Sequence, residues 1–157
     1  RLHQWPTAFF SPEAGPSLAH LSRLAEVWTG CPITKQWGEK NQMTREQLQA
    51  FGKETKNAFH FVECGMPTLT NILSRFRELV ARYGVKICII DPYNQMSVQS
   101  TEDNTKADLQ ALTQMRKFAM DYDVLFILVA HPKLVKKYAN GDFETPGMMD
   151  IFGGSVM

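Results

Sequence analysis

The sequence has few cysteines, almost no net charge and no long apolar run. Its three cysteines, Cys31, Cys64 and Cys88, lack the paired spacing of a metal site or a disulfide framework, which favours reduced thiols. A formal charge of +1 excludes a global basic or acidic field, so nucleic acid would need a local patch. No apolar run approaches the roughly 20 residues of a membrane-spanning helix. We therefore expect a cytoplasmic protein without a membrane partner.

The sequence also lacks a glycine-rich phosphate loop of the form G-x-x-x-x-G-K-S/T. With 157 residues, of which 44% are apolar, it is long enough for a single domain with a real core. Both ends of the chain enter patterned segments at once. We therefore expect a fragment of a longer protein, truncated at both ends.

The most informative stretch is the apolar run at 86–90, which ends in Asp91 and Pro92. A run of branched apolar residues that is too short for a helix predicts a strand buried on both faces of a parallel sheet. In open α/β sheets, ligands bind outside the carboxyl ends of the strands. Asp91 is therefore placed at a candidate site.

Three further apolar runs predict strands, at 7–10, 58–63 and 124–131. Helices are predicted between the strands, because apolar residues recur there at three- and four-residue spacing and capping residues flank them. Their ranges are about 17–29, 44–55, 68–83 and 105–121. Strands that alternate with helices are typical of crossover units. The predicted fold class is α/β, with a mainly parallel sheet and helices on both faces.

A polar residue lies at or just beyond the carboxyl end of each predicted strand. These residues are Glu13, Glu63, Asp91 and His131. If the sheet is parallel, all four lie along one edge. A residue of this kind can equally be a helix cap or a solvated turn residue. Carboxylates and an imidazole at one edge can bind a metal directly, do acid–base work, or serve a nucleoside triphosphate with magnesium.

Four segments, in this order, resemble the RecA-like ATPase domain of hexameric replicative helicases, the DnaB-type and phage primase-helicase group. The segments are FFSPE at 9–13, ICIIDPYN at 87–94, LVAHPK at 128–133 and DIFGGS at 150–155. The resemblance implies that Glu13 is the catalytic base and that Asp91, on the Walker B strand, organises Mg²⁺, through water. It also implies that His131 senses the γ-phosphate of ATP. The family's phosphate loop would precede Arg1, and its arginine finger would follow Met157.

The aperiodic segment at 132–149 corresponds, on this resemblance, to a loop that faces single-stranded DNA. Lys133, Lys136 and Lys137 would contact phosphates; a solvated basic loop is the alternative. Tyr93 and Asn94 would line the nucleotide pocket, or else serve the turn. The resemblance further implies a homo-oligomer, a hexameric ring, in the full-length protein.

Two other functions stay open. One is a degenerate RecA-like module that oligomerises or binds partners without hydrolysis. The other is a metal-dependent hydrolase in which Glu13, Asp91 and His131 are direct ligands.

Overall fold

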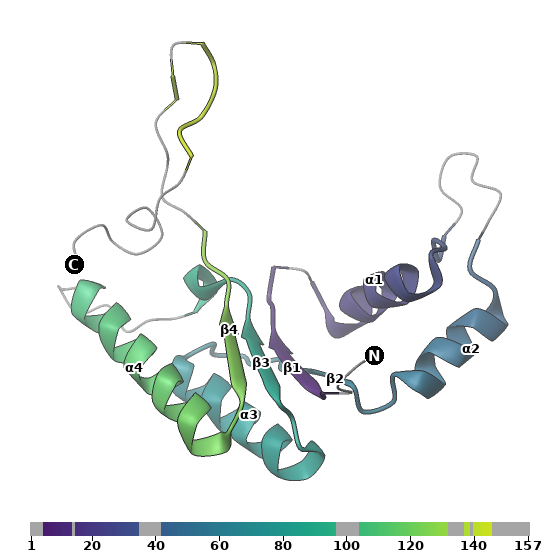
Figure 1. Cartoon of the computed structure of the whole chain (residues 1–157), viewed down its shortest axis with the longest axis horizontal. Helices are drawn as coiled ribbons and strands as arrows, with labels where there is room; N and C mark the ends of the chain where they lie inside the picture. The colour runs from purple at the N-terminus through teal and green to yellow at the C-terminus, as the bar shows by residue number, and fades with distance from the viewer. Residues whose placement is uncertain are drawn as a thin grey trace.

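A computed structural model of the chain describes residues 5–13, 15–34, 42–96, 104–131, 137–138 and 140–145. The elements follow one another as strands separated by helices (Figure 1). They are β1 (Thr7–Phe10), α1 (Ser17–Thr29), α2 (Arg45–Glu54), β2 (Phe59–Phe61), α3 (Leu69–Tyr83), β3 (Ile87–Ile90), the short 3-10 helix η1 (Tyr93–Gln95), α4 (Asn104–Tyr122) and β4 (Leu125–Leu128).

The four strands form one parallel sheet in the order β2-β1-β3-β4. Phe9 is paired with Ile89, and Ile89 with Ile127, so β3 lies between β1 and β4. All carboxyl ends therefore meet at one edge of the sheet. This confirms the predicted α/β class and the shared edge.

The helix ends follow from local chemistry. The Thr44 side chain accepts a hydrogen bond from the Gln47 backbone N–H, and the Gln47 side chain accepts one from the Thr44 N–H, which is a capping box at the start of α2. Gly84 ends α3 with φ of 65°, a left-handed conformation that glycine adopts without strain. Both ends were predicted at these residues.

The core lies between one face of the sheet and helices α3 and α4. Ile72 and Phe76 of α3 pack in it against Cys88 and Ile90 of β3, and all four side chains are fully buried. Removing a buried phenylalanine side chain costs about 3–5 kcal/mol, so Phe76 contributes strongly to the stability of this layer. The carboxyl end of β3 is thereby fixed from below.

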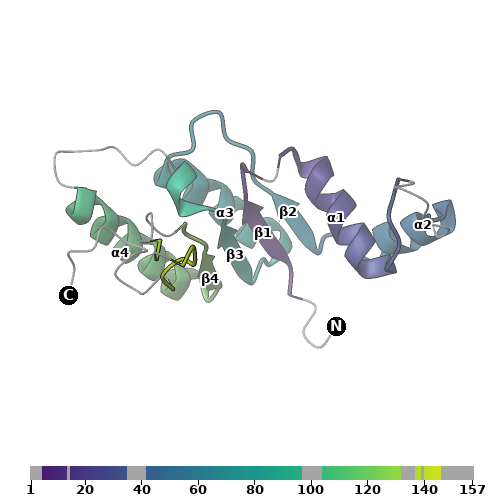
Figure 2. The same cartoon turned by 90° about the horizontal axis from the view of Figure 1, so that it is seen from above.

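The opposite face of the sheet is covered unevenly. Helix α1 lies over the β1–β2 side, where the His20 ring stacks on Phe61 at 5.1 Å, and Figure 2 shows α1 and α2 extending away from that side. On the β3–β4 side, no helix of the described residues covers the sheet, and Leu125 and Ile127 are 50% and 38% exposed. The prediction that β4 is buried on both faces is therefore wrong. None of the described helices is long and apolar enough to cross a membrane.

Candidate active site

Glu13 and His131 meet at the carboxyl edge of the sheet. Glu13 follows β1 and His131 follows β4; the His131 Nε2 lies 3.1 Å from Glu13 Oε2 and 3.3 Å from Oε1. A carboxylate only accepts hydrogen bonds, so the imidazole nitrogen carries the proton. The side chains of His131 and Glu13 are 57% and 44% exposed. Because exposed ion pairs add little stability, the value of this pair lies in its placement.

Gln95 is the third partner in this cluster, and its role was missed in the sequence. The amide Nε2 of Gln95 donates to Glu13 Oε1 at 3.1 Å. Hydrogen bonds from Gln95 and then from His131 hold the pKa of Glu13 below its ordinary value. Glu13 is therefore an ionised carboxylate at neutral pH, the form that can accept a proton.

The turn η1 holds the ends of β3 and β4 together. The Oδ1 of Asn94 accepts the backbone N–H of His131 at 2.9 Å, and the backbone N–H of Tyr93 donates to the Val129 carbonyl at 2.7 Å. The two bonds extend the pairing of β3 and β4 beyond the strands themselves. They fix the backbone that presents His131 to Glu13.

Tyr93 anchors this turn from within the core. Its ring is 6% exposed, and its hydroxyl donates to Asp108 of α4 at 2.6 Å. Burial, and then the Asp108 carboxylate, raise the pKa of Tyr93, so the hydroxyl stays a donor. Of the two predicted pocket residues, Asn94 therefore lies at the edge of the sheet, whereas the Tyr93 side chain is turned toward α4.

Asp91 lies at the end of β3, as predicted. Its backbone N–H donates to the Phe10 carbonyl at 2.9 Å, and its Oδ2 accepts from the Ser11 hydroxyl at 3.3 Å. Its Oδ1 makes no hydrogen bond with any described residue. Mg²⁺ keeps several waters and binds through one or two carboxylates together with substrate phosphates. A single oriented carboxylate with one open oxygen fits that mode.

A metal held only by protein side chains fits less well. Within the described ranges, no three His, Cys, Asp or Glu side chains are close enough together to hold an ion. Glu13 already accepts from Gln95 and His131, and Asp91 from Ser11. The geometry therefore disfavours the alternative in which Glu13, Asp91 and His131 are direct ligands.

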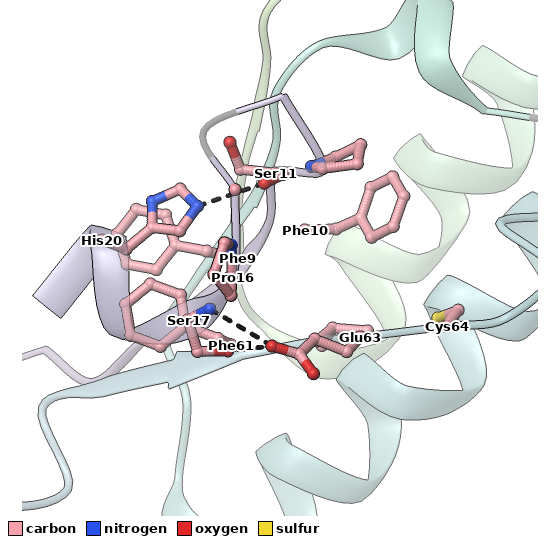
Figure 3. Close-up of a pocket in the computed structure, with 12 residues that line it drawn as sticks. Phe9, Phe10, Ser11, Pro16, Ser17, His20, Phe61, Glu63 and Cys64 are labelled. Atoms are coloured by element: carbon pink, nitrogen blue, oxygen red, sulfur yellow. Dashed lines mark hydrogen bonds between the residues drawn. The ribbon is translucent and has the colours of Figure 1, made fainter.

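Glu63, the remaining residue at a strand end, caps a helix. Its Oε1 accepts the backbone N–H of Ser17 at 3.2 Å and also the Ser17 hydroxyl (Figure 3). These bonds lower the pKa of Glu63, and a carboxylate is favourable at a helix N-terminus. Nearby, His20 donates to the Ser11 carbonyl at 3.1 Å, in a pocket of about 220 Å³. Glu63 thus takes the structural role that strand-end acids often have.

Only part of the predicted DNA-facing loop is described. Lys137 pairs with Phe143 in an antiparallel bridge, and its Nζ lies 5.4 Å from the centre of the Phe143 ring. Tyr138 is 53% exposed. We call residues 137–143 the hairpin; in Figure 1 it stands away from the sheet beyond β4. Lys133, Lys136 and the segment 150–155 lie outside the described residues.

Comparisons with known proteins agree with this arrangement. No protein-family model matches the chain. The chain is 30% identical over 119 residues to the chloroplastic/mitochondrial Twinkle homologue of Arabidopsis thaliana, an alignment that covers 73% of the chain and 16% of that protein.

Two solved structures share the fold. The ATPase domain of a DnaB-like helicase matches with a TM-score of 0.71 and 16% identity, over 94% of this chain and 54% of that one. The structure of a DnaB-like replicative helicase and its interactions with primase matches with a TM-score of 0.63 and 15% identity, over 82% and 33%. The chain spans less than two thirds of each of these relatives. The comparisons confirm the resemblance predicted from the sequence: the chain has the RecA-like fold of the ATPase domain of DnaB-type replicative helicases.

Proposed function

We propose that this chain is the ATPase core of an ATP-dependent nucleic-acid motor, a replicative DNA helicase in its full-length form. The observation that carries the proposal is the meeting of Glu13, Asp91 and His131 at the ends of three neighbouring strands, β1, β3 and β4. A base, a metal-organising acid and a phosphate-sensing donor are the groups that phosphoryl transfer to water requires.

In this proposal Asp91 holds Mg²⁺ through water, and ATP is the substrate. The ion, when bound, neutralises charge on the phosphates. Glu13 accepts a proton from the attacking water, for which its lowered pKa keeps it ionised. His131 carries a proton on Nε2 and can donate it in a hydrogen bond to a phosphate oxygen instead of to Glu13. Asn94 fixes the His131 backbone during that exchange.

Single-stranded DNA is the proposed second partner. The hairpin continues directly from the strand that ends at His131, so a change in the hydrogen bond between His131 and Glu13 has a short path to it. Lys133, Lys136 and Lys137 are the proposed phosphate contacts. A homo-oligomeric, hexameric ring and a cytoplasmic location belong to the same proposal.

The test is ATP hydrolysis by the full-length protein, with and without single-stranded DNA, for the wild type and Asp91→Asn. We expect DNA-stimulated, Mg²⁺-dependent turnover in the wild type and a loss of at least about 10²-fold in the variant, on the order expected for removal of an electrostatic group at a reacting centre. Ser22→Ala, on the exposed surface of α1, is the control. Nucleotide binding without any turnover in the wild type would instead support the degenerate binding module.

A further inference from the structure

The hydrogen bonds to Glu13 are distributed unequally between its two oxygens. Oε1 accepts from both Gln95 and His131, at 3.1 Å and 3.3 Å, whereas Oε2 accepts only from His131, at 3.1 Å. Each carboxylate oxygen has about two lone-pair positions. Both positions of Oε1 are therefore in use, while Oε2 keeps one for another donor.

Gln95 is presented by a turn that is held on two sides. The Tyr93 hydroxyl ties η1 to Asp108 of α4, and the Asn94 side chain ties it to the His131 backbone. Gln95 itself is exposed, so its side chain is not needed to fill the core. Its amide contributes direction to Glu13 rather than packing.

We propose that Gln95 is a positioning residue for Glu13: it occupies Oε1 and thereby directs Oε2 toward the attacking water. The inference rests on the proposed role of Glu13 as the base. In the step it serves, the water oxygen bonds to the γ-phosphorus while its proton passes to Oε2. The bond from that phosphorus to the bridging oxygen breaks, and ADP keeps the electron pair.

Other charged groups around Glu13 are accounted for by partners on neighbouring elements. His131, from the end of β4, contacts Glu13 directly, and Asp91, from the end of β3, accepts from Ser11. The Glu63 carboxylate, beyond β2, is turned to Ser17, and Asp108 of α4 is turned to Tyr93. Among the described residues, Gln95 and His131 are therefore the groups that tune Glu13.

The test measures the pH profile of kcat/KM for ATP hydrolysis by the full-length protein, because that ratio reports groups of the free enzyme. Gln95→Met keeps the length of the side chain and removes the amide. We expect kcat to fall about tenfold with KM little changed, the size of one lost hydrogen bond to a charged group. The acidic limb should move to higher pH, because a bond that stabilises the charged Glu13 is gone.

Gln95→Glu should move that limb further in the same direction, because two carboxylates at this distance disfavour each other's ionised form. Gln114→Met, at an exposed site on α4, is the matched control and should leave both kcat and the limb unchanged. Thermal unfolding of each variant checks that the fold is kept. If Gln95→Met unfolds early, the limb of Gln95→Glu decides.

The outcomes separate this inference from the proposed function. An inactive Glu13→Gln together with an unmoved acidic limb in both Gln95 variants would overturn the role of Gln95 and leave Glu13 as the base. Near-wild-type turnover in Glu13→Gln would overturn both. An inactive Glu13→Gln with limbs displaced in the order wild type, Gln95→Met, Gln95→Glu supports the positioning role.

Discussion

The Nε2 of His131 lies 3.1 Å from the Oε2 of Glu13, although 118 residues separate the two in the chain and their strands are not neighbours. Strand β3 runs between β1 and β4, so the two side chains reach across about 10 Å of sheet. They meet beside the end of β3, where Asp91 and Gln95 follow. The pair thus links three strand ends into one site.

The proposed DNA contacts predict a salt-dependent binding defect. Replacing Lys133, Lys136 and Lys137 with alanine should weaken single-stranded DNA binding and flatten the dependence of log K on log salt by about 0.7 per lost phosphate contact, or about 2 for the three. Fluorescence anisotropy of a labelled oligonucleotide at several salt concentrations measures this slope. Lys53→Ala with Lys56→Ala, near the end of α2 and away from the hairpin, is the control. An unchanged slope in the triple variant would remove the loop from the account.

The helix cap made by Glu63 predicts a pH dependence of stability. Its folded-state pKa is lowered below the ordinary value of 4.5 by Ser17, so the stabilisation is present above that value and is lost as the pH falls through the folded pKa. Glu63→Gln should therefore unfold at a lower temperature than the wild type at neutral pH. The difference should shrink as the pH is lowered below about 4.5. A difference that stays constant with pH would contradict the cap.

The anchor of η1 predicts a stability effect as well. Tyr93→Phe removes the hydroxyl that donates to Asp108. We expect a loss of about 1–2 kcal/mol in the free energy of unfolding, because the carboxylate loses a buried donor. Tyr83→Phe, on the exposed side of α3, whose hydroxyl bonds no described residue, should change little. Equal unfolding temperatures for the wild type and Tyr93→Phe would show that the turn has another anchor.

The fold could largely be predicted from the sequence, because apolar period and capping residues act locally. Thr44, Gly84 and the run ending at Asp91 each specify an element by short-range chemistry. The exposure of β4 could not be predicted in this way, since an apolar run does not say which helix covers it. Leu125 and Ile127 are exposed because α1 lies over the other side of the sheet.

The site could be predicted only where a strand end carries it. Glu13, Asp91 and His131 follow strands, so the parallel topology alone brings them to one edge. Gln95 was missed because its contact depends on the 3-10 turn after Asp91, which no periodicity announces. Glu63 carries the same strand-end signal as the others, yet its partner Ser17 makes it a cap.

The central claim is that Glu13 activates the water that attacks ATP. The most direct measurement is the rate of DNA-stimulated ATP hydrolysis by the full-length protein carrying Glu13→Gln, with nucleotide binding measured in parallel. The amide keeps the size of the side chain and its hydrogen bonds in part, but it cannot accept the proton. We predict a rate at least about 10²-fold below the wild type with nucleotide affinity largely kept. A near-wild-type rate would contradict the account.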